Sequence, residues 1–169
     1  VLAGSGYLTT PTVTISSPFS GTSGTPAVAN IVGETASSGG NINTKYISRR
    51  VTLEDGFDAS DLKVIVNAYK PLGSGIHVYF KVKSDEDPED FDKKDYVLMS
   101  QETPSSVFSL TEGDTKELVF KSANDAITYT SSNVTYEKFK TFAIKIALTS
   151  NNATVIPKVR DMRAIALDE

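Results

Sequence analysis

The densest group of side chains that could carry chemistry lies in residues 84–95, SDEDPEDFDKKD, which hold seven carboxylates. Calcium takes about six to eight oxygen ligands, and alternate acids in a loop can supply them. The candidate ligands are Asp85, Asp87, Asp90 and Asp92. The run lacks the central glycine and the closing glutamate of an EF-hand, and two lysines partly neutralise it. We therefore expect a solvated connection between strands, with calcium binding and paired catalytic carboxylates as the alternatives.

Nucleophilic and metal-dependent catalysis lack their usual residues. His77 is the only histidine, cysteine is absent, and no Gly-x-Ser-x-Gly motif occurs. A glycosidase needs two carboxyl groups that face each other across a cleft, and no spacing here indicates such a pair. The glycines at positions 4 and 6 lack the Gly-Lys-Ser/Thr of a phosphate-binding loop. We expect no catalytic residue, no cofactor and no enzymatic activity.

Sugar binding is the alternative function that the composition keeps open. Seven tyrosines are present, although tryptophan is absent. Exposed rings on one face of a β-sheet can stack on a sugar ring, and Tyr69 and Tyr79 fall in two predicted strands where they could share the polar face. Tyrosine on a sheet is also a common half-buried strand residue or interface anchor. The alternative is a carbohydrate-binding module for attachment to a host or another surface.

The elements that would position these residues are strands. The sequence alternates apolar and polar residues at 62–69, 76–83 and 142–148, a period of two that predicts strands with one buried face. In 76–83 the polar positions hold His77, Tyr79, Lys81 and Lys83. Residues 73–75, Gly-Ser-Gly, predict a hairpin between the first two runs. Pro157 interrupts the last strand and predicts an edge position or a bulge.

The whole pattern predicts an all-β chain with two parts. Residues 41–169 fit an antiparallel β-sandwich, jelly-roll-like in our first interpretation and immunoglobulin-like in the second. Residues 1–40 are rich in Gly, Ser and Thr, contain one charged side chain, Glu34, and include β-type runs at 12–15 and 27–32. Two or three short strands are not stable alone in water. This small β module must therefore pack on the sandwich, on upstream residues or on a partner.

Composition and charge limit the classes of partner that the chain is expected to bind. The 169 residues carry a formal net charge of −4, and the basic residues form no continuous stripe, which disfavours nucleic acid and anionic membranes. No apolar run is long enough for a membrane helix. We therefore expect a soluble protein that works through contacts with other proteins.

Two segments carry a family resemblance. The first, GSGYLTTPTVTIS followed by GTPAVANIV, resembles the short β-repeat Gly-x-Gly-Tyr-x-x-x-Pro-Thr-Val-Thr-Ile of tail and fibre proteins of tailed bacteriophages. Its matching residues include Gly6, Tyr7, Pro11, Val13 and Ile15. The second segment, residues 44–82 with 87–99 and 139–167, resembles a β-sandwich module of virion structural proteins in T4-like phages, particularly cyanophages. Residues 100–138 match least well.

The resemblance implies a structural component of a phage virion, in the tail, baseplate or fibre region, that assembles non-covalently with copies of itself and with other virion proteins. It implies no catalytic residue. Because the chain starts within the repeat, we also expect a C-terminal piece of a longer protein. The expected interface anchors are aromatic and arginine side chains: Tyr7, Phe19, Tyr46, Arg49 and Arg50.

Overall fold

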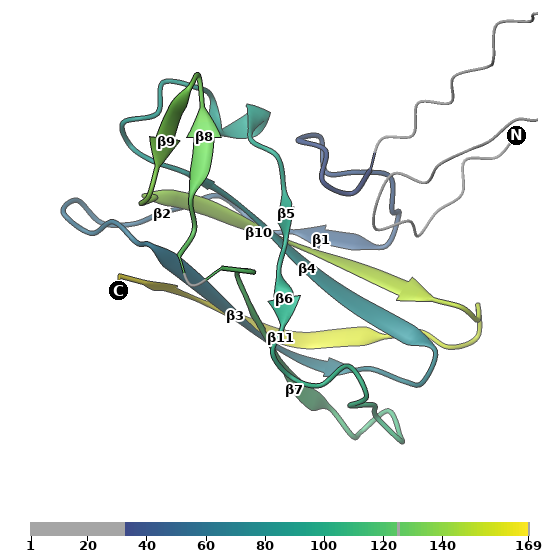
Figure 1. The fold of residues 1–169 in the computed structure, drawn as a ribbon. Coiled ribbons are helices and arrows are strands. Elements are labelled where there is room, and N and C mark those ends of the chain that lie inside the picture. Colours follow the sequence, from purple (N-terminus) through teal and green to yellow (C-terminus); the bar gives the residue numbers. More distant parts are fainter. Residues whose placement is uncertain (1–32, 125, 169) are drawn as a thin grey trace, which may run out of the picture.

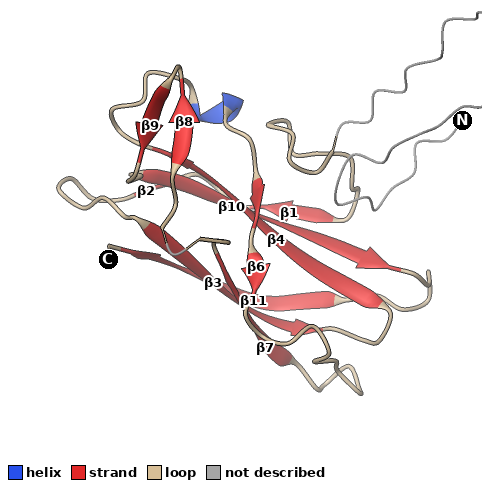
Figure 2. Cartoon of the chain, in the orientation of Figure 1, coloured by secondary structure: helices blue, strands red, loops and turns tan. Residues whose placement is uncertain are grey.

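The protein is an antiparallel β-sandwich in a computed structural model that describes residues 33–124 and 126–168 (Figure 1). Two layers of strands pack face to face, and one short 3₁₀ helix, η1 (Phe91–Lys93), is the single helical element of the described part (Figure 2). The predictions for residues 1–32, including the β-runs, Tyr7 and Phe19, lie outside the described residues. The all-β class and the sandwich that the alternation predicts are confirmed.

The first sheet is built on two long central strands. Strand β10 (Thr141–Ser150) pairs along its whole length with β4 (Ser74–Lys83), with Ile144 opposite Phe80. Two short strands, β1 (Lys45–Ile47) and β2 (Val51–Thr52), pair with the other side of β10, and β5 (Val97–Leu98) pairs with β4. All of these pairings are antiparallel.

The second sheet has the order β11, β3, β7, β6. Its strands are β3 (Asp61–Tyr69), β6 (Ser100–Gln101), β7 (Lys116–Lys121) and β11 (Lys158–Leu167). A separate hairpin joins β8 (Tyr129–Ser131) to β9 (Val134–Tyr136). Its turn residues Ser132 and Asn133 both have positive φ, 49° and 65°, the geometry that two-residue hairpin turns favour.

The predicted hairpin at residues 73–75 is wrong. β3 and β4 are consecutive in sequence, yet they lie in different sheets, and β4 pairs with β10 instead. β10 and β11 are divided between the sheets in the same way. A hairpin would place both apolar faces in one layer, whereas crossing between the layers lets the two faces bury each other. The pairings establish a sandwich, and the jelly-roll-like connectivity stays a prediction.

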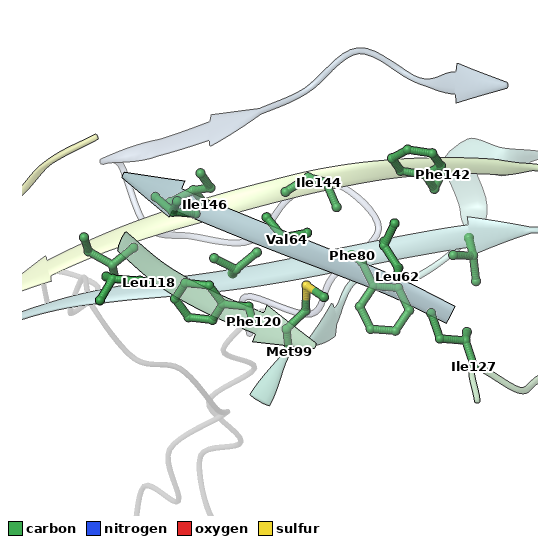
Figure 3. Packing of buried hydrophobic residues seen from close by; sticks show 14 of the residues in the cluster. Leu62, Val64, Phe80, Met99, Leu118, Phe120, Ile127, Phe142, Ile144 and Ile146 are labelled. Carbon is green, nitrogen blue, oxygen red and sulfur yellow. The ribbon is translucent and has the colours of Figure 1, made fainter. Parts of the chain in front are cut away.

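The core occupies the space between the two layers (Figure 3). The apolar positions of each alternating run point into it, so the period of two predicted the inward-facing set correctly. Its fully or almost fully buried members on the long strands are Leu62, Val64, Val66, Ala68, Ile76, Val78, Phe80, Val82, Leu118, Phe120, Phe142, Ile144 and Ile146.

The edge position predicted from Pro157 is confirmed, but the proline does not interrupt the strand. This proline directly precedes β11, which is an edge strand of the second sheet. The register between β11 and β3 shifts between Val159 and Asp161, a local irregularity of the kind that a β-bulge produces. No helix in the described ranges is long and apolar enough to cross a membrane.

Candidate assembly surface

The outer face of the first sheet is covered by chain, although its polar residues predict a solvated face. Tyr79 and Lys81 on β4 and Lys145 on β10 are all buried. Residues 33–42 cover one part of this face, and the segment 91–96 covers another, where the Lys81 ammonium lies 4.7 Å from the ring centroid of Phe91 and 5.0 Å from that of Tyr96. Together these contacts form a second, mixed core outside the sandwich.

A buried ion pair holds residues 33–42 on the sheet. The Lys145 ammonium, 0% exposed, lies 3.6 Å from the carboxylate of Glu34 and donates to the Glu34 backbone carbonyl. It also lies 4.2 Å from the ring centroid of Tyr79 and 4.7 Å from that of Tyr96. The backbone N–H of Ile42 donates to the Glu34 carboxylate. Glu34 was expected in the N-terminal module, and its side chain packs on the sandwich.

Burial shifts the pKa values of Lys145 and of the neighbouring Tyr79. Loss of hydration lowers the pKa of Lys145 to about 8, although the negative charge of Glu34 acts in the opposite direction. Burial, with the Glu34 charge, raises the pKa of Tyr79 to about 12. The remaining oxygen of the Glu34 carboxylate and the Tyr79 hydroxyl have no hydrogen-bond partner among the described residues. The charge of Glu34 therefore acts on the pKa values of both Lys145 and Tyr79.

The acidic loop is organised around Asp87 and Lys94. The Lys94 ammonium lies 2.5 Å from the Asp87 carboxylate and 2.6 Å from that of Glu89, and it donates to the Ser131 hydroxyl. The Tyr129 hydroxyl donates to the same Asp87 carboxylate at 2.9 Å. Burial would raise the pKa of Asp87, but these hydrogen bonds prevail and lower it to about 2. The network ties the loop to the β8–β9 hairpin.

The four proposed calcium ligands do not converge. Asp87 is buried against Lys94, while Asp85, Asp90 and Asp92 are exposed. Across residues 33–124 and 126–168, no three acidic or histidine side chains are grouped so that they could hold a metal ion. A lysine therefore supplies the positive charge beside Asp87 that calcium would supply.

The two tyrosines proposed for sugar stacking do not share a face. Tyr69 ends β3 in one sheet, and Tyr79 lies on β4 in the other. Tyr79 is also 0% exposed, because residues 33–42 and Tyr96 pack over it. The described residues thus provide no joint platform from these two rings. The period of two placed Tyr79 on the outward face correctly, but it carried no information about what covers that face.

The proposed interface anchors within the described ranges lie on or beside β1 and β2. Tyr46 is 56% exposed on β1. Arg49 and Arg50 follow β1 and are exposed, and the Arg50 guanidinium lies 5.7 Å from the ring centroid of Phe91. These side chains are accessible for contact.

Sequence reasoning missed three strongly exposed apolar side chains at the end of the sandwich where three connections meet. We call this surface the loop end and define it by Leu72, Leu110 and Ile156. Their exposed fractions are 74%, 91% and 59%. The three connections surround a hollow of about 460 Å³ whose lining also includes Tyr69 and Val155. Each residue is one of only one or two apolar side chains in its connection, a weak sequence signal that periodicity does not detect.

Contacts fix the connections of the loop end. The Lys70 ammonium donates to the Ser105 carbonyl at 3.0 Å and lies 4.9 Å from the ring centroid of Phe108. The Ser109 N–H donates to the Lys70 carbonyl at 2.7 Å. Lys158 forms an ion pair with Glu112 beside the hollow. The apolar side chains therefore project from a backbone that is already held in place.

A search of protein families, curated proteins and solved structures found no match.

Proposed function

We propose that this chain is a structural component of a bacteriophage virion, in the tail, baseplate or fibre region, where it acts through non-covalent assembly with copies of itself and other virion proteins. The resemblance of two sequence segments to phage proteins supports the virion assignment. The accessible surfaces of the sandwich support assembly as the mode of action.

The observation that carries the proposal is the loop end. Soluble proteins seldom expose several large apolar side chains together unless the patch meets another surface. Leu72, Leu110 and Ile156 come from three connections and line one hollow. Burying a leucine side chain contributes about 1.5–3 kcal/mol. Because hydrogen bonds already hold the connection that carries Leu110, little conformational entropy is lost when a partner binds.

The sandwich behind this surface is suited to bearing load. Buried ion pairs join the covering segments to the strands at two separated places, Glu34 with Lys145 and Asp87 with Lys94. Removing either partner of such a pair leaves a buried charge without compensation, so each covering segment is held firmly in one position. A rigid block with one apolar end suits a part that is placed between neighbours.

The test is the self-association of the full 169-residue chain, measured by sedimentation velocity and light scattering over a range of concentrations. We expect reversible association that Leu110→Ser weakens by roughly 10- to 100-fold in Kd, the equivalent of one lost leucine. Val134→Ser is the matched control, because Val134 is 51% exposed on the β8–β9 hairpin, at the other end of the molecule (Figure 1).

Two results would contradict the proposal. In the first, Leu110→Ser and Val134→Ser change the Kd of self-association equally, which would mean that association does not depend on the loop end. In the second, the chain is monomeric at every concentration and binds a glycan on an array, which would favour the carbohydrate-binding alternative. A glycan array is therefore run on the same preparation.

A further inference from the structure

Strand β11 is the longest edge strand in the two sheets of the sandwich. It has ten residues, whereas the other strands at sheet edges, β1, β2, β5 and β6, have two or three each. Within residues 33–124 and 126–168, β11 pairs with β3 alone. The N–H and carbonyl groups on its other side are therefore available to a further strand.

The inner face of β11 is incompletely covered. Met162 lies opposite Val66 of β3, yet Val66 is 0% exposed and Met162 is only half-buried. Ala164 and Ala166 are half-buried in the same way, although all three side chains of β11 pack against the core. Met162 also lines a groove of about 770 Å³ whose lining is both apolar and charged. A strand added beside β11 would cover this flank of the core.

The outer face of β11 carries two opposite charges, two residues apart. Asp161 lies opposite Asn67 and Arg163 opposite Ile65, so both side chains point away from the core. They are 63% and 55% exposed. Charges on an edge strand usually prevent unselective pairing. Because these two differ in sign, they restrict pairing to a register in which opposite charges meet.

One two-fold register satisfies both charges. When two copies of a strand pair antiparallel about a two-fold axis, residues at equal distances from the axis lie opposite each other. An axis at Met162 places Asp161 of each copy opposite Arg163 of the other. An axis at Asp161 or at Arg163 would place a charge opposite itself. An axis at Ala164 would place Arg163 opposite Ile165.

The same register keeps the inner faces of the two copies together. Met162 meets Met162 of the second copy at the axis, on the core side of the sheet. The register shift in β11 skips one residue, so Ala164 lies opposite Val159 of the second copy. The β3 residues opposite Val159 and Ala164 are fully buried, so these two side chains also face the core side.

We infer that β11 docks a second copy of this chain by antiparallel pairing about a two-fold axis at Met162, which joins the two second sheets into one continuous sheet. Backbone hydrogen bonds and the burial of the half-covered inner side chains stabilise the contact. Asp161 and Arg163 set its register, because exposed ion pairs give selectivity more than affinity. The contact uses none of the residues that define the loop end, so it stands apart from the proposed function.

The first experiment traps the pairing with a disulfide. The chain contains no cysteine, so Met162→Cys introduces a single thiol. At the axis the two Cα atoms lie about 4.5–5.5 Å apart, within the range that a disulfide spans. Ile165→Cys is the matched control. Ile165 is 42% exposed on the same strand, but it lies three residues from the axis, so its two copies are about 20 Å apart. Under mild oxidation we expect at least about tenfold more covalent dimer from Met162→Cys.

The second experiment tests the register by charge reversal. Asp161→Arg places arginines opposite each other at both cross-strand pairs, so we expect the Kd of the dimer in sedimentation velocity to rise roughly tenfold. Adding Arg163→Asp to that variant restores opposite charges at both pairs and recovers most of the affinity. Both experiments are carried out in the Leu110→Ser background, where the loop-end contact is weakened. Failure of the loop end and failure of the β11 pairing are then distinguished. Urea unfolding checks that each variant folds.

Three results would overturn the inference. In the first, Ile165→Cys cross-links as readily as Met162→Cys, which would mean that the copies meet without this register. In the second, the double variant of Asp161 and Arg163 associates no more tightly than Asp161→Arg alone. In the third, Met162→Cys stays monomeric under oxidation, which would mean that another part of the chain or a different partner occupies the edge of β11.

Discussion

The buried pair of Glu34 and Lys145 offers the sharpest test of how the sandwich is held together. Replacing Lys145 with methionine keeps an unbranched apolar side chain of similar length but removes the charge. The Glu34 carboxylate is 1% exposed, and it would keep the Ile42 N–H as its hydrogen-bond donor. The variant therefore isolates the cost of leaving that carboxylate unpaired.

The expected cost follows from burial. Removing one partner of a buried ion pair typically costs about 3–5 kcal/mol of unfolding free energy. Methionine also removes the hydration penalty that lowers the pKa of Lys145, about 2 kcal/mol, so we expect a net loss of about 1–3 kcal/mol. For a chain of this size that lowers Tm by roughly 2–12 °C. Glu34→Gln should cost less, because the amide can still accept from Ile42 and a lysine with a pKa of about 8 can lose its proton near neutral pH. The double variant should be more stable than Lys145→Met alone, since it leaves no buried charge.

The pH dependence has a definite sign. The pKa of Lys145 is about 8 in the folded protein and about 10.5 when unfolded. Between these values the unfolded chain binds the extra proton, so stability rises with pH, by roughly 2 kcal/mol between pH 8 and 10. The raised pKa of Tyr79 reverses the trend above about pH 10, where the unfolded tyrosine ionises first. Lys145→Met should lack the rise.

Urea unfolding followed by circular dichroism measures these free energies. The control is Lys93→Met, because the Lys93 side chain is 68% exposed and its nearest carboxylate oxygen is 4.0 Å away. If Lys145→Met lowered the unfolding free energy by less than about 1 kcal/mol, the reasoning would be refuted, because an unpaired buried carboxylate should destabilise the fold by more than that. A double variant less stable than either single variant would refute it as well.

Three further predictions concern the acidic loop and the turn before β1. The pKa of Asp87 is about 2 when folded and 3.8 when unfolded, so about 2 kcal/mol of stability present at neutral pH should be lost as pH falls from about 4 to 2, and Asp87→Asn should not show this loss in acid unfolding. Gly40→Ala should destabilise by at least about 1 kcal/mol more than Gly56→Ala in urea unfolding, because both have positive φ but only at Gly40 would a Cβ lie 2.6 Å from the Cα of Glu34. An equal loss would exclude the steric cause. Calcium or a chelator should leave Tm unchanged in calorimetry, because Lys94 already pairs with Asp87, and a calcium-dependent rise would restore the acidic loop as a metal site.

The candidate site was less predictable than the strands. Tyr46 was expected as an anchor because it is an aromatic residue at the start of the sandwich; its side chain is exposed, and its role in an interface stays a prediction. Leu72, Leu110 and Ile156 were not, because they are separated by 38 and 46 residues and only the folded chain gathers them around one hollow. Single apolar residues in loops are common, so their sequence positions did not indicate a shared surface.

The sequence by itself determined the long strands with clear alternation, their inward faces and the edge position after Pro157, because side-chain alternation and the missing proline N–H act within a few residues. The tertiary structure decided which strands pair: β3 and β4 lie in different sheets because each apolar face is best buried against the other layer. It also decided that the polar face with Tyr79 and Lys145 is covered. That cover comes from residues 33–42 and Tyr96, which are far from Lys145 in the sequence, and the contacts depend on long-range packing that no local pattern encodes.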